Sequence, residues 1–182
     1  MAEIVGRAAE LASLQTFLDR IPMGASALVL QGEAGMGKTT LWRAGVEAAQ
    51  AAGLRVLQAE PAESETELSF SGLGDLLDPV LDEVLASLPA GQRSALARAL
   101  VLEEVEGPPP DAHAAGVALL NALRGLCGTR DVLVAVDDVQ WLDAASSSAL
   151  AYAARRLRAE RVGLLLSRRA GHESPLLDDL RR

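Results

Sequence analysis

The only lysine of the chain, Lys38, lies in the stretch GEAGMGKT at residues 32–39, and every other basic residue among the 17 lysines and arginines is arginine. This stretch, called the phosphate loop below, has the Gly-x-x-x-x-Gly-Lys-Thr spacing at which backbone N–H groups surround phosphates. A lysine ammonium can curl over such a loop as a point charge, whereas a planar guanidinium needs a bidentate partner. The spacing therefore predicts that Lys38 contacts the β- and γ-phosphates of a nucleotide.

The other residue types of the phosphate loop suit the same chemistry. Glycines at positions 32, 35 and 37 allow positive φ angles, which turn consecutive N–H groups toward an anion. Thr39 opens a helix whose N-terminal dipole attracts negative charge, and its hydroxyl is placed to ligate magnesium. The predicted nucleotide-binding residues are Gly32, Glu33, Ala34, Gly35, Met36, Gly37, Lys38, Thr39 and Thr40.

A plain glycine-rich turn before an ordinary helix is the alternative interpretation of this stretch. The context favours the phosphate loop, because residues 27–30 are a short apolar run typical of a buried strand and residues 41–48 continue as a helix. Gly45 inside that helix costs some helix propensity and predicts close packing on a sheet.

Two adjacent carboxylates follow a second apolar run. Residues 132–136 are continuously apolar, which predicts a central strand covered on both faces, and Asp137 and Asp138 come directly after it. Carboxylates at the carboxyl end of a parallel strand point into the crevice where such sheets bind ligands. Asp137 is expected to hold magnesium, directly or through water, and Asp138 to polarise the attacking water.

Composition limits the other possibilities. The chain has 182 residues, 49% of them hydrophobic, which predicts one domain over residues 1–182. A net charge of -8 gives no overall electrostatic attraction for DNA or an anionic membrane. The single cysteine, Cys127, excludes an internal disulfide and is expected to fill the core. No apolar stretch approaches the ~20 residues that span a bilayer, and no secretory leader is recognisable, so we expect a cytoplasmic protein.

Apolar periodicity indicates where the remaining elements lie. Strands are expected at residues 54–59 and 162–166 in addition to the two above, and helices at residues 10–18, 41–52 and 144–157. Residues 68–126 are expected to be helices interrupted at Pro89 and at residues 107–110. Alternating strands and helices predict an α/β fold with a parallel sheet and helices on both faces.

Four stretches together resemble a known family: IVGRAAEL at residues 4–11, the phosphate loop, LSFSGLGDLL at residues 68–77, and VAVDDVQWLD at residues 134–143. The chain resembles the ATPase domain of the large ATP-binding regulators of the LuxR family, in the signal-transducing (STAND) branch of AAA-like P-loop ATPases. The resemblance covers nearly the whole chain. It implies an ATP-dependent switch in a bacterial transcriptional regulator, with ATP or ADP and Mg²⁺ as ligands.

The resemblance also implies roles for further residues. Val5, Gly6 and Arg7 match the family's N-terminal box near the adenine and ribose, or are merely the approach to a helix. After the fourth strand, Arg169 is the first choice for a γ-phosphate sensor and Arg168 the second, or either is a solvated strand end. Gln140 and Trp141 could couple the acidic pair to the rest of the domain, although the more common interpretation of Trp141 is that it fills the core. Asp143 is expected to cap the next helix, and His113 and His172 to be surface residues without partners.

The family pattern implies a three-layer sandwich with strand order 2-3-4-1. Its fifth strand, helical lid, sensor region and helix-turn-helix are not among these residues, so the fold is expected to be truncated before the fifth strand and lid. The phosphate-loop strand is then an exposed edge open to self-association, and no direct DNA contact is expected from this segment. Asp138 replaces the glutamate of many efficient relatives, which implies slow hydrolysis.

Three functions stay open at this point. The favoured one is a nucleotide-binding switch with weak ATPase activity, in which Lys38, Asp138 and Arg169 serve catalysis. A P-loop kinase of a small molecule is the alternative from a different class. A degenerate fragment that binds nothing is the third, and the intact Lys38, Thr39 and Asp137 argue against it.

Overall fold

The computed structural model describes residues 6–102 and 111–180. In chain order the elements are α1 (Ala8–Arg20), a 3-10 turn (Ile21–Met23), β1 (Ser26–Gly32), α2 (Lys38–Ala51), β2 (Arg55–Ala59), a 3-10 turn (Glu63–Glu65), α3 (Ser71–Leu77), a 3-10 turn (Asp78–Val80), α4 (Leu81–Ser87), α5 (Ala90–Ala99), α6 (Ala112–Cys127), β3 (Val132–Val136), a 3-10 turn (Val139–Trp141), α7 (Ala144–Ala154), β4 (Val162–Arg169) and α8 (Pro175–Leu180).

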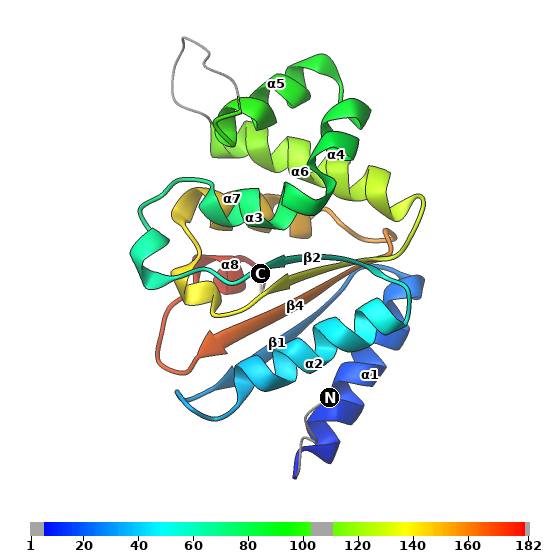
Figure 1. Cartoon of the computed structure of the whole chain (residues 1–182), viewed down its shortest axis with the longest axis vertical. Helices are drawn as coiled ribbons and strands as arrows, with labels where there is room; N and C mark the ends of the chain where they lie inside the picture. Colours follow the sequence, from blue (N-terminus) through cyan, green and yellow to red (C-terminus); the bar gives the residue numbers. More distant parts are fainter. Residues whose placement is uncertain (1–5, 103–110, 181–182) are drawn as a thin grey trace.

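The four strands form one parallel sheet in the order β1-β4-β3-β2 (Figure 1). This is the predicted order 2-3-4-1, and it places β1 and β4 side by side although more than a hundred residues separate them in sequence. The carboxyl ends of β1, β3 and β4 therefore meet at one edge of the sheet, where the phosphate loop and the two carboxylates also lie. None of the described helices has the length and apolar character needed to cross a membrane.

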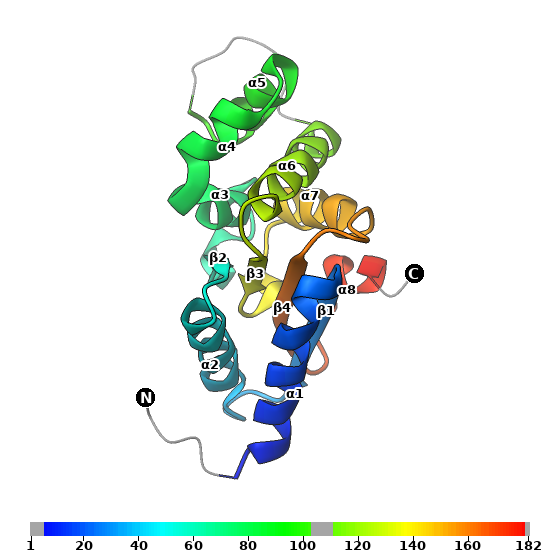
Figure 2. The ribbon, with the colours of Figure 1, turned by 90° about the vertical axis from the view of Figure 1, so that its right-hand side faces the viewer.

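Helices cover both faces of the sheet. One face packs against α1 and α2, and the other against α3, α6, α7 and α8 (Figures 1 and 2). The helices α4 and α5 pack on α6, farther from the sheet. The predicted arrangement of a parallel sheet between helices is therefore confirmed, with α4 and α5 as an added outer tier.

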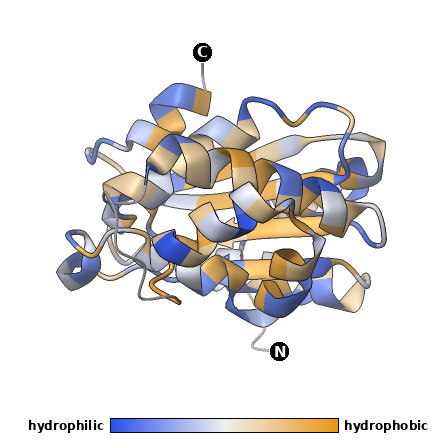
Figure 3. Cartoon of the chain, turned by 90° about the horizontal axis from the view of Figure 1, so that it is seen from above, coloured by the Kyte–Doolittle hydropathy of each residue, from blue (hydrophilic) through white to orange (hydrophobic). Residues whose placement is uncertain are grey.

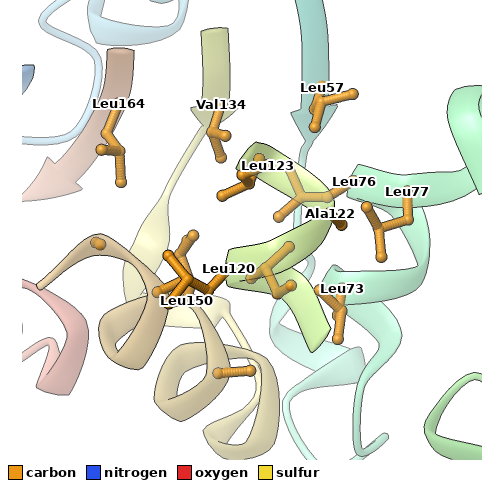
Figure 4. Packing of buried hydrophobic residues seen from close by; sticks show 14 of the residues in the cluster. Leu57, Leu73, Leu76, Leu77, Leu120, Ala122, Leu123, Val134, Leu150 and Leu164 are labelled. Atoms are coloured by element: carbon orange, nitrogen blue, oxygen red, sulfur yellow. The ribbon is translucent and has the colours of Figure 1, made fainter. Parts of the chain in front are cut away.

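The core is built around β3, all five of whose residues are buried. Val132, Val134 and Val136 join the cluster with α3, α6 and α7, whereas Leu133 and Ala135 join the cluster with α1 and α2. Figure 4 shows Val134 grouped with leucines of the neighbouring helices. Seen from above, the apolar strands lie enclosed between helices with hydrophilic outer positions (Figure 3). Cys127 is buried in the core as expected.

Some element boundaries differ from the predicted ones. β4 continues to Arg169 instead of ending at residue 166, because residues 167–169 pair with the end of β1. α7 ends at Ala154, three residues early, and β2 begins at Arg55. The predicted break at Pro89 is confirmed, while residues 107–110 lie outside the described part.

Gly45 marks a close contact between α2 and the sheet, as its place in a helix predicted. A Cβ at this position would lie 2.7 Å from Leu165 Cδ2 and 3.0 Å from Leu14 Cδ2. The missing side chain therefore lets α2 lie close to both β4 and α1. The same helix begins at Lys38, a few residues after the carboxyl end of β1.

Candidate nucleotide site

The phosphate loop joins β1 to α2 through two glycines in the left-handed region. Gly35 has φ +78° and Gly37 has φ +76°, and Gly37 is the N-terminal cap of α2. Residues 33–37 are all exposed. The predicted backbone conformation is thus present, and N–H groups at the start of α2 lack helical partners, which favours an anion at this position.

Lys38 lies over the phosphate loop. Its Nζ donates a hydrogen bond of 2.9 Å to the backbone oxygen of Glu33. The ammonium is therefore held on the loop itself by a contact that an incoming phosphate oxygen can replace. Thr39 follows in the first turn of α2, and Thr40 is exposed.

The stretch of residues 137–143, called the acidic loop below, begins at the end of β3. Asp137 is only 5% exposed, and its Oδ1 accepts hydrogen bonds from Ser167 Oγ and from the N–H of Asp138, the latter at 3.2 Å. Both side-chain hydrogen bonds in the described structure go to Oδ1. The second oxygen, Oδ2, is left as an acceptor, the type of ligand that Mg²⁺ prefers.

Asp138 has a left-handed backbone, with φ +47° and ψ +55°. Its N–H donates to Ser167 Oγ at 2.8 Å, and its Oδ1 accepts from Gln140 Nε2 at 2.8 Å. Aspartate tolerates this region better than most residues, and strained backbone of this kind concentrates at functional sites. The Asp138 carboxylate lies beside Arg169, whose guanidinium is 3.7 Å from Oδ2.

Gln140 links the acidic loop to β4. Its amide nitrogen donates to Asp138, while its amide oxygen accepts from the N–H of Arg169 at 3.1 Å. Sequence reasoning gave Gln140 only a general coupling role and missed this bridge. The bridge fixes the Asp138 carboxylate relative to the end of β4.

These parts enclose a cleft of about 260 Å³ at the carboxyl edge of the sheet. Its lining brings together residues from the phosphate loop, the acidic loop and β4, namely Ala34, Gly35, Gly37, Lys38, Thr39, Asp138 and Arg169. Three segments far apart in sequence thus supply two cations, one carboxylate and a helix N-terminus to one small space. That combination suits a phosphate chain with a bound divalent cation.

Comparison with known proteins identifies the family of the chain that forms this cleft. The family model described as AAA ATPase domain matches residues 3–166, which is most of the chain. The chain belongs to the AAA ATPase domain family. It is also 27% identical over 210 residues to an uncharacterized protein of Rhizobium meliloti, an alignment covering 96% of this chain and 19% of that relative. The chain thus spans about a fifth of that relative's length.

The predicted N-terminal box, residues 5–7, is described in part. Val5 lies outside the described residues, and Gly6 has φ +80°. Arg7 forms an ion pair of 3.0 Å with Glu10 and donates a second hydrogen bond to the backbone oxygen of Met36. Arg7 therefore contacts the phosphate loop directly.

The two candidate sensor arginines of β4 point to different places. Arg169 lines the cleft, but Arg168 donates to Gln31 Oε1 at 2.8 Å and is absent from the cleft lining. Both lie within β4, which corrects the prediction that they follow the strand. Alternation of side chains along a strand puts neighbouring residues on opposite faces, so only one of them can face the cleft.

Trp141 is half-buried beside the cleft instead of filling the core as expected. The Arg169 guanidinium lies 5.9 Å from its ring centroid, and the His172 ring lies 5.6 Å away in an edge-to-face arrangement. His172 and His113 are exposed as predicted, but each contacts an aromatic ring, His113 that of Tyr152.

Asp143 ends the acidic loop and caps two helices. Its carboxylate accepts from Ser146 N of α7, as expected for an N-cap, at 2.9 Å. It also accepts from the N–H groups of Phe70 and Gly72 at the start of α3, at 2.8 and 3.2 Å. Because Asp143 is 1% exposed, the acidic loop is tied to the helical layer through a buried charge at two positive helix ends.

The residues present fit a magnesium–nucleotide pair better than a metal held by protein alone. In residues 6–102 and 111–180, no cluster of three or more His, Cys, Asp or Glu side chains could hold a metal ion. Mg²⁺ is usually held by one or two protein oxygens together with substrate phosphates. Thr39 lines the cleft and carries a hydroxyl oxygen. Asp137 is not in the cleft lining, but it directly precedes Asp138, which is, and among the described residues its Oδ2 accepts no side-chain hydrogen bond.

Proposed function

We propose that this AAA ATPase domain binds ATP and ADP with Mg²⁺, hydrolyses ATP slowly and acts as a nucleotide-dependent switch. The observation that supports this most is the cleft in which Lys38, Thr39, Asp138 and Arg169 converge on the phosphate loop. A phosphate chain bound there replaces the Glu33 carbonyl as the partner of Lys38.

Each residue has a distinct role in this proposal. The N–H groups of the phosphate loop and Lys38 bind the β- and γ-phosphates, and Thr39 and Asp137 hold the cation. The bound Mg²⁺ supplies positive charge that offsets the charge of the phosphate oxygens. Asp138 orients and polarises the attacking water, and Arg169 contacts the γ-phosphate.

Slow turnover is part of the proposal because Asp138 is engaged before any substrate binds. One of its oxygens accepts from Gln140, and the other lies 3.7 Å from Arg169. For Arg169 to reach the γ-phosphate, its interaction with Asp138 has to weaken. Asp138 also has a shorter side chain than glutamate, so it positions water less well.

We assign the switch to a LuxR-family transcriptional regulator, in which other segments bind DNA and the effector. Support comes from the four family-like stretches in their expected order and from the much longer relative of which this chain covers 19%. With a net charge of -8, this segment makes no direct DNA contact in the proposal. We place the protein in the cytoplasm.

Self-association through β1 is a further part of this proposal. β1 lies at one edge of the described sheet, and its residues alternate between half-buried and exposed, with Val29 37% exposed. An open edge presents unpaired N–H and C=O groups to another strand. Light scattering tests this: a strictly monomeric mass at high concentration would exclude it.

Calorimetric titration of ATP and ADP, with and without Mg²⁺, tests the central proposal. Wild type is expected to bind in the micromolar range, and Lys38→Ala to lose at least about 100-fold in affinity, because the charge-assisted phosphate contact is gone. Arg130→Ala, which removes an exposed cation on the loop before β3, is the matched control and keeps wild-type affinity. Unchanged affinity in Lys38→Ala would sink the proposal.

A phosphate-release assay separates the enzyme classes. Slow release of inorganic phosphate without an acceptor supports the ATPase. Transfer of the γ-phosphate to a small molecule identifies the chain as a kinase instead.

A further inference from the structure

An ion pair lies beside the candidate magnesium site without belonging to the cleft. Arg43 of α2 pairs with Glu60, the residue directly after β2, with 2.9 Å between Nη2 and Oε2. The preceding residue, Ala59, accepts a hydrogen bond of 3.0 Å from the N–H of Asp137. Glu60 therefore lies at the same edge of the sheet as Asp137.

Arg43 is related to the site through its own helix. It follows Thr39 by four residues, so both side chains lie on one face of α2. Glu60, through its hydrogen bond and its charge, raises the pKa of Arg43, and the charge of Asp137 raises it further. The guanidinium thus lies within the field of both carboxylates.

This ion pair is not explained by a contribution to the stability of the fold. The Arg43 side chain is 60% exposed and that of Glu60 is 47% exposed. Ion pairs this exposed contribute little to folding. Their effect on a nearby divalent cation can be larger, because the interaction scales with the double charge of the metal.

We infer that Glu60 is a positioning residue: it holds the Arg43 guanidinium away from Asp137 and thereby sets the affinity of the nucleotide site for Mg²⁺. This inference rests on the proposed function. Without Glu60, the Arg43 guanidinium is no longer held by an ion pair and can approach Asp137, whose charge already acts on it, in competition with the metal. Without Arg43, the competing charge is gone and Glu60 has nothing to position.

The test measures ATP affinity at a series of Mg²⁺ concentrations and in excess chelator, at about 0.15 M salt so that exposed distant charges are screened. The variants are Arg43→Met, Glu60→Gln and the double substitution. Glu83→Gln is the matched control, because Glu83 pairs with Arg55 at the opposite end of β2 at 2.6 Å. For each variant, the ratio of the ATP affinities with and without Mg²⁺ measures the contribution of the metal, because direct contacts to the nucleotide are present in both conditions.

Glu60→Gln is expected to weaken Mg²⁺ binding by about threefold to tenfold. Arg43→Met is expected to change Mg²⁺ affinity by less than about twofold, because Glu60 already holds the Arg43 charge away from Asp137 in wild type. In the Arg43→Met background, the added Glu60→Gln change is expected to shift Mg²⁺ affinity by less than about twofold. Such non-additivity is the mark of one residue acting through another. Glu83→Gln is expected to match wild type.

Three outcomes overturn the inference. Equal Mg²⁺ dependence in all variants shows that the pair has no influence on the metal. A Glu60→Gln effect that persists undiminished in the Arg43→Met background shows that Glu60 acts through its own charge. Failure of wild type to bind nucleotide removes the site itself, and with it the proposed function, whereas the first two outcomes leave that function intact.

Discussion

The phosphate loop and the acidic loop face the same cleft but are built in opposite ways. Residues 33–37 of the phosphate loop are exposed, and a Cβ added at Gly35 or Gly37 would meet nothing within 4 Å. In the acidic loop, Asp137 and Asp143 are 5% and 1% exposed, and their carboxylates accept hydrogen bonds from other segments. One side of the cleft is shaped by backbone conformation and the other by buried side-chain contacts.

Because of this difference, substitutions in the two loops should impair different properties of the protein. The phosphate loop has few tertiary contacts to lose, so changes there should affect ligand binding far more than folding. The acidic loop connects β3, β4, α3 and α7, so changes there should affect folding first. Substitutions in the two loops, ordered by expected effect, test this contrast.

Asp143→Ala should give the largest effect, a loss of about 3–5 kcal/mol in the free energy of unfolding. It leaves the buried N–H groups of Phe70, Gly72 and Ser146 without their acceptor. Urea unfolding with linear extrapolation measures it. Asp111→Ala is the control, since Asp111 is an exposed cap whose side chain bonds only His113 N in the described structure, and should cost about 1 kcal/mol. Equal losses in both variants would contradict the contrast.

Gly37→Ala should combine a smaller folding loss with a large binding loss. Holding alanine at φ +76° costs about 1–2 kcal/mol, with no clash to add to it. Gly53→Ala is a matched control, because Gly53 has φ +83° and equally open surroundings at the other end of α2. Both variants should lose similar stability, while only Gly37→Ala should lower nucleotide affinity in calorimetry. If Gly53→Ala also lowered affinity, general destabilisation would explain the loss.

The contrast between local backbone conformation and contacts between distant segments also explains which features could be predicted from the sequence. The phosphate loop was predicted because its signal is local: glycine spacing, one lysine and an apolar strand before them. Strand β3 and the sheet order were likewise predicted, from a continuous apolar run and from the family resemblance. Local periodicity could not place residues 167–169 in β4, because their strand conformation comes from pairing with β1.

The acidic loop was predicted only in its first two residues and its helix cap. The N–H groups that Asp143 also accepts from, at Phe70 and Gly72, lie some seventy residues away in sequence, so only the folded chain reveals them. The same holds for the Gln140 amide, whose partners come from both the acidic loop and β4. For the same reason the sequence could not show that Trp141 is half-buried, or that Arg169 lines the cleft and Arg168 does not. Residue type alone does not tell which face of an element a side chain occupies.

A half-buried carboxylate at the opposite end of the sheet, Glu160, allows the effect of burial to be tested on the same kind of hydrogen bonding. Glu160, before β4, accepts from the N–H of Arg158 at 2.7 Å and from Arg124 Nε at 2.8 Å. These two hydrogen bonds lower the pKa of Glu160 from 4.5 to about 2. Because the folded pKa lies below the unfolded one, the stabilisation is present above pH 4.5 and is lost as the pH falls toward 2.

Glu160→Gln should therefore cost less than about 1 kcal/mol near neutral pH, since the Arg124 side chain is 44% exposed and solvent screens the pair. Urea unfolding from pH 7 down to pH 3 should show the gap between wild type and variant shrinking steadily below pH 4.5. The exposed Glu67, changed to glutamine, is the control for the loss of one charge. A gap as large as that of Asp143→Ala would mean that burial is not what makes the carboxylates of the acidic loop important to folding.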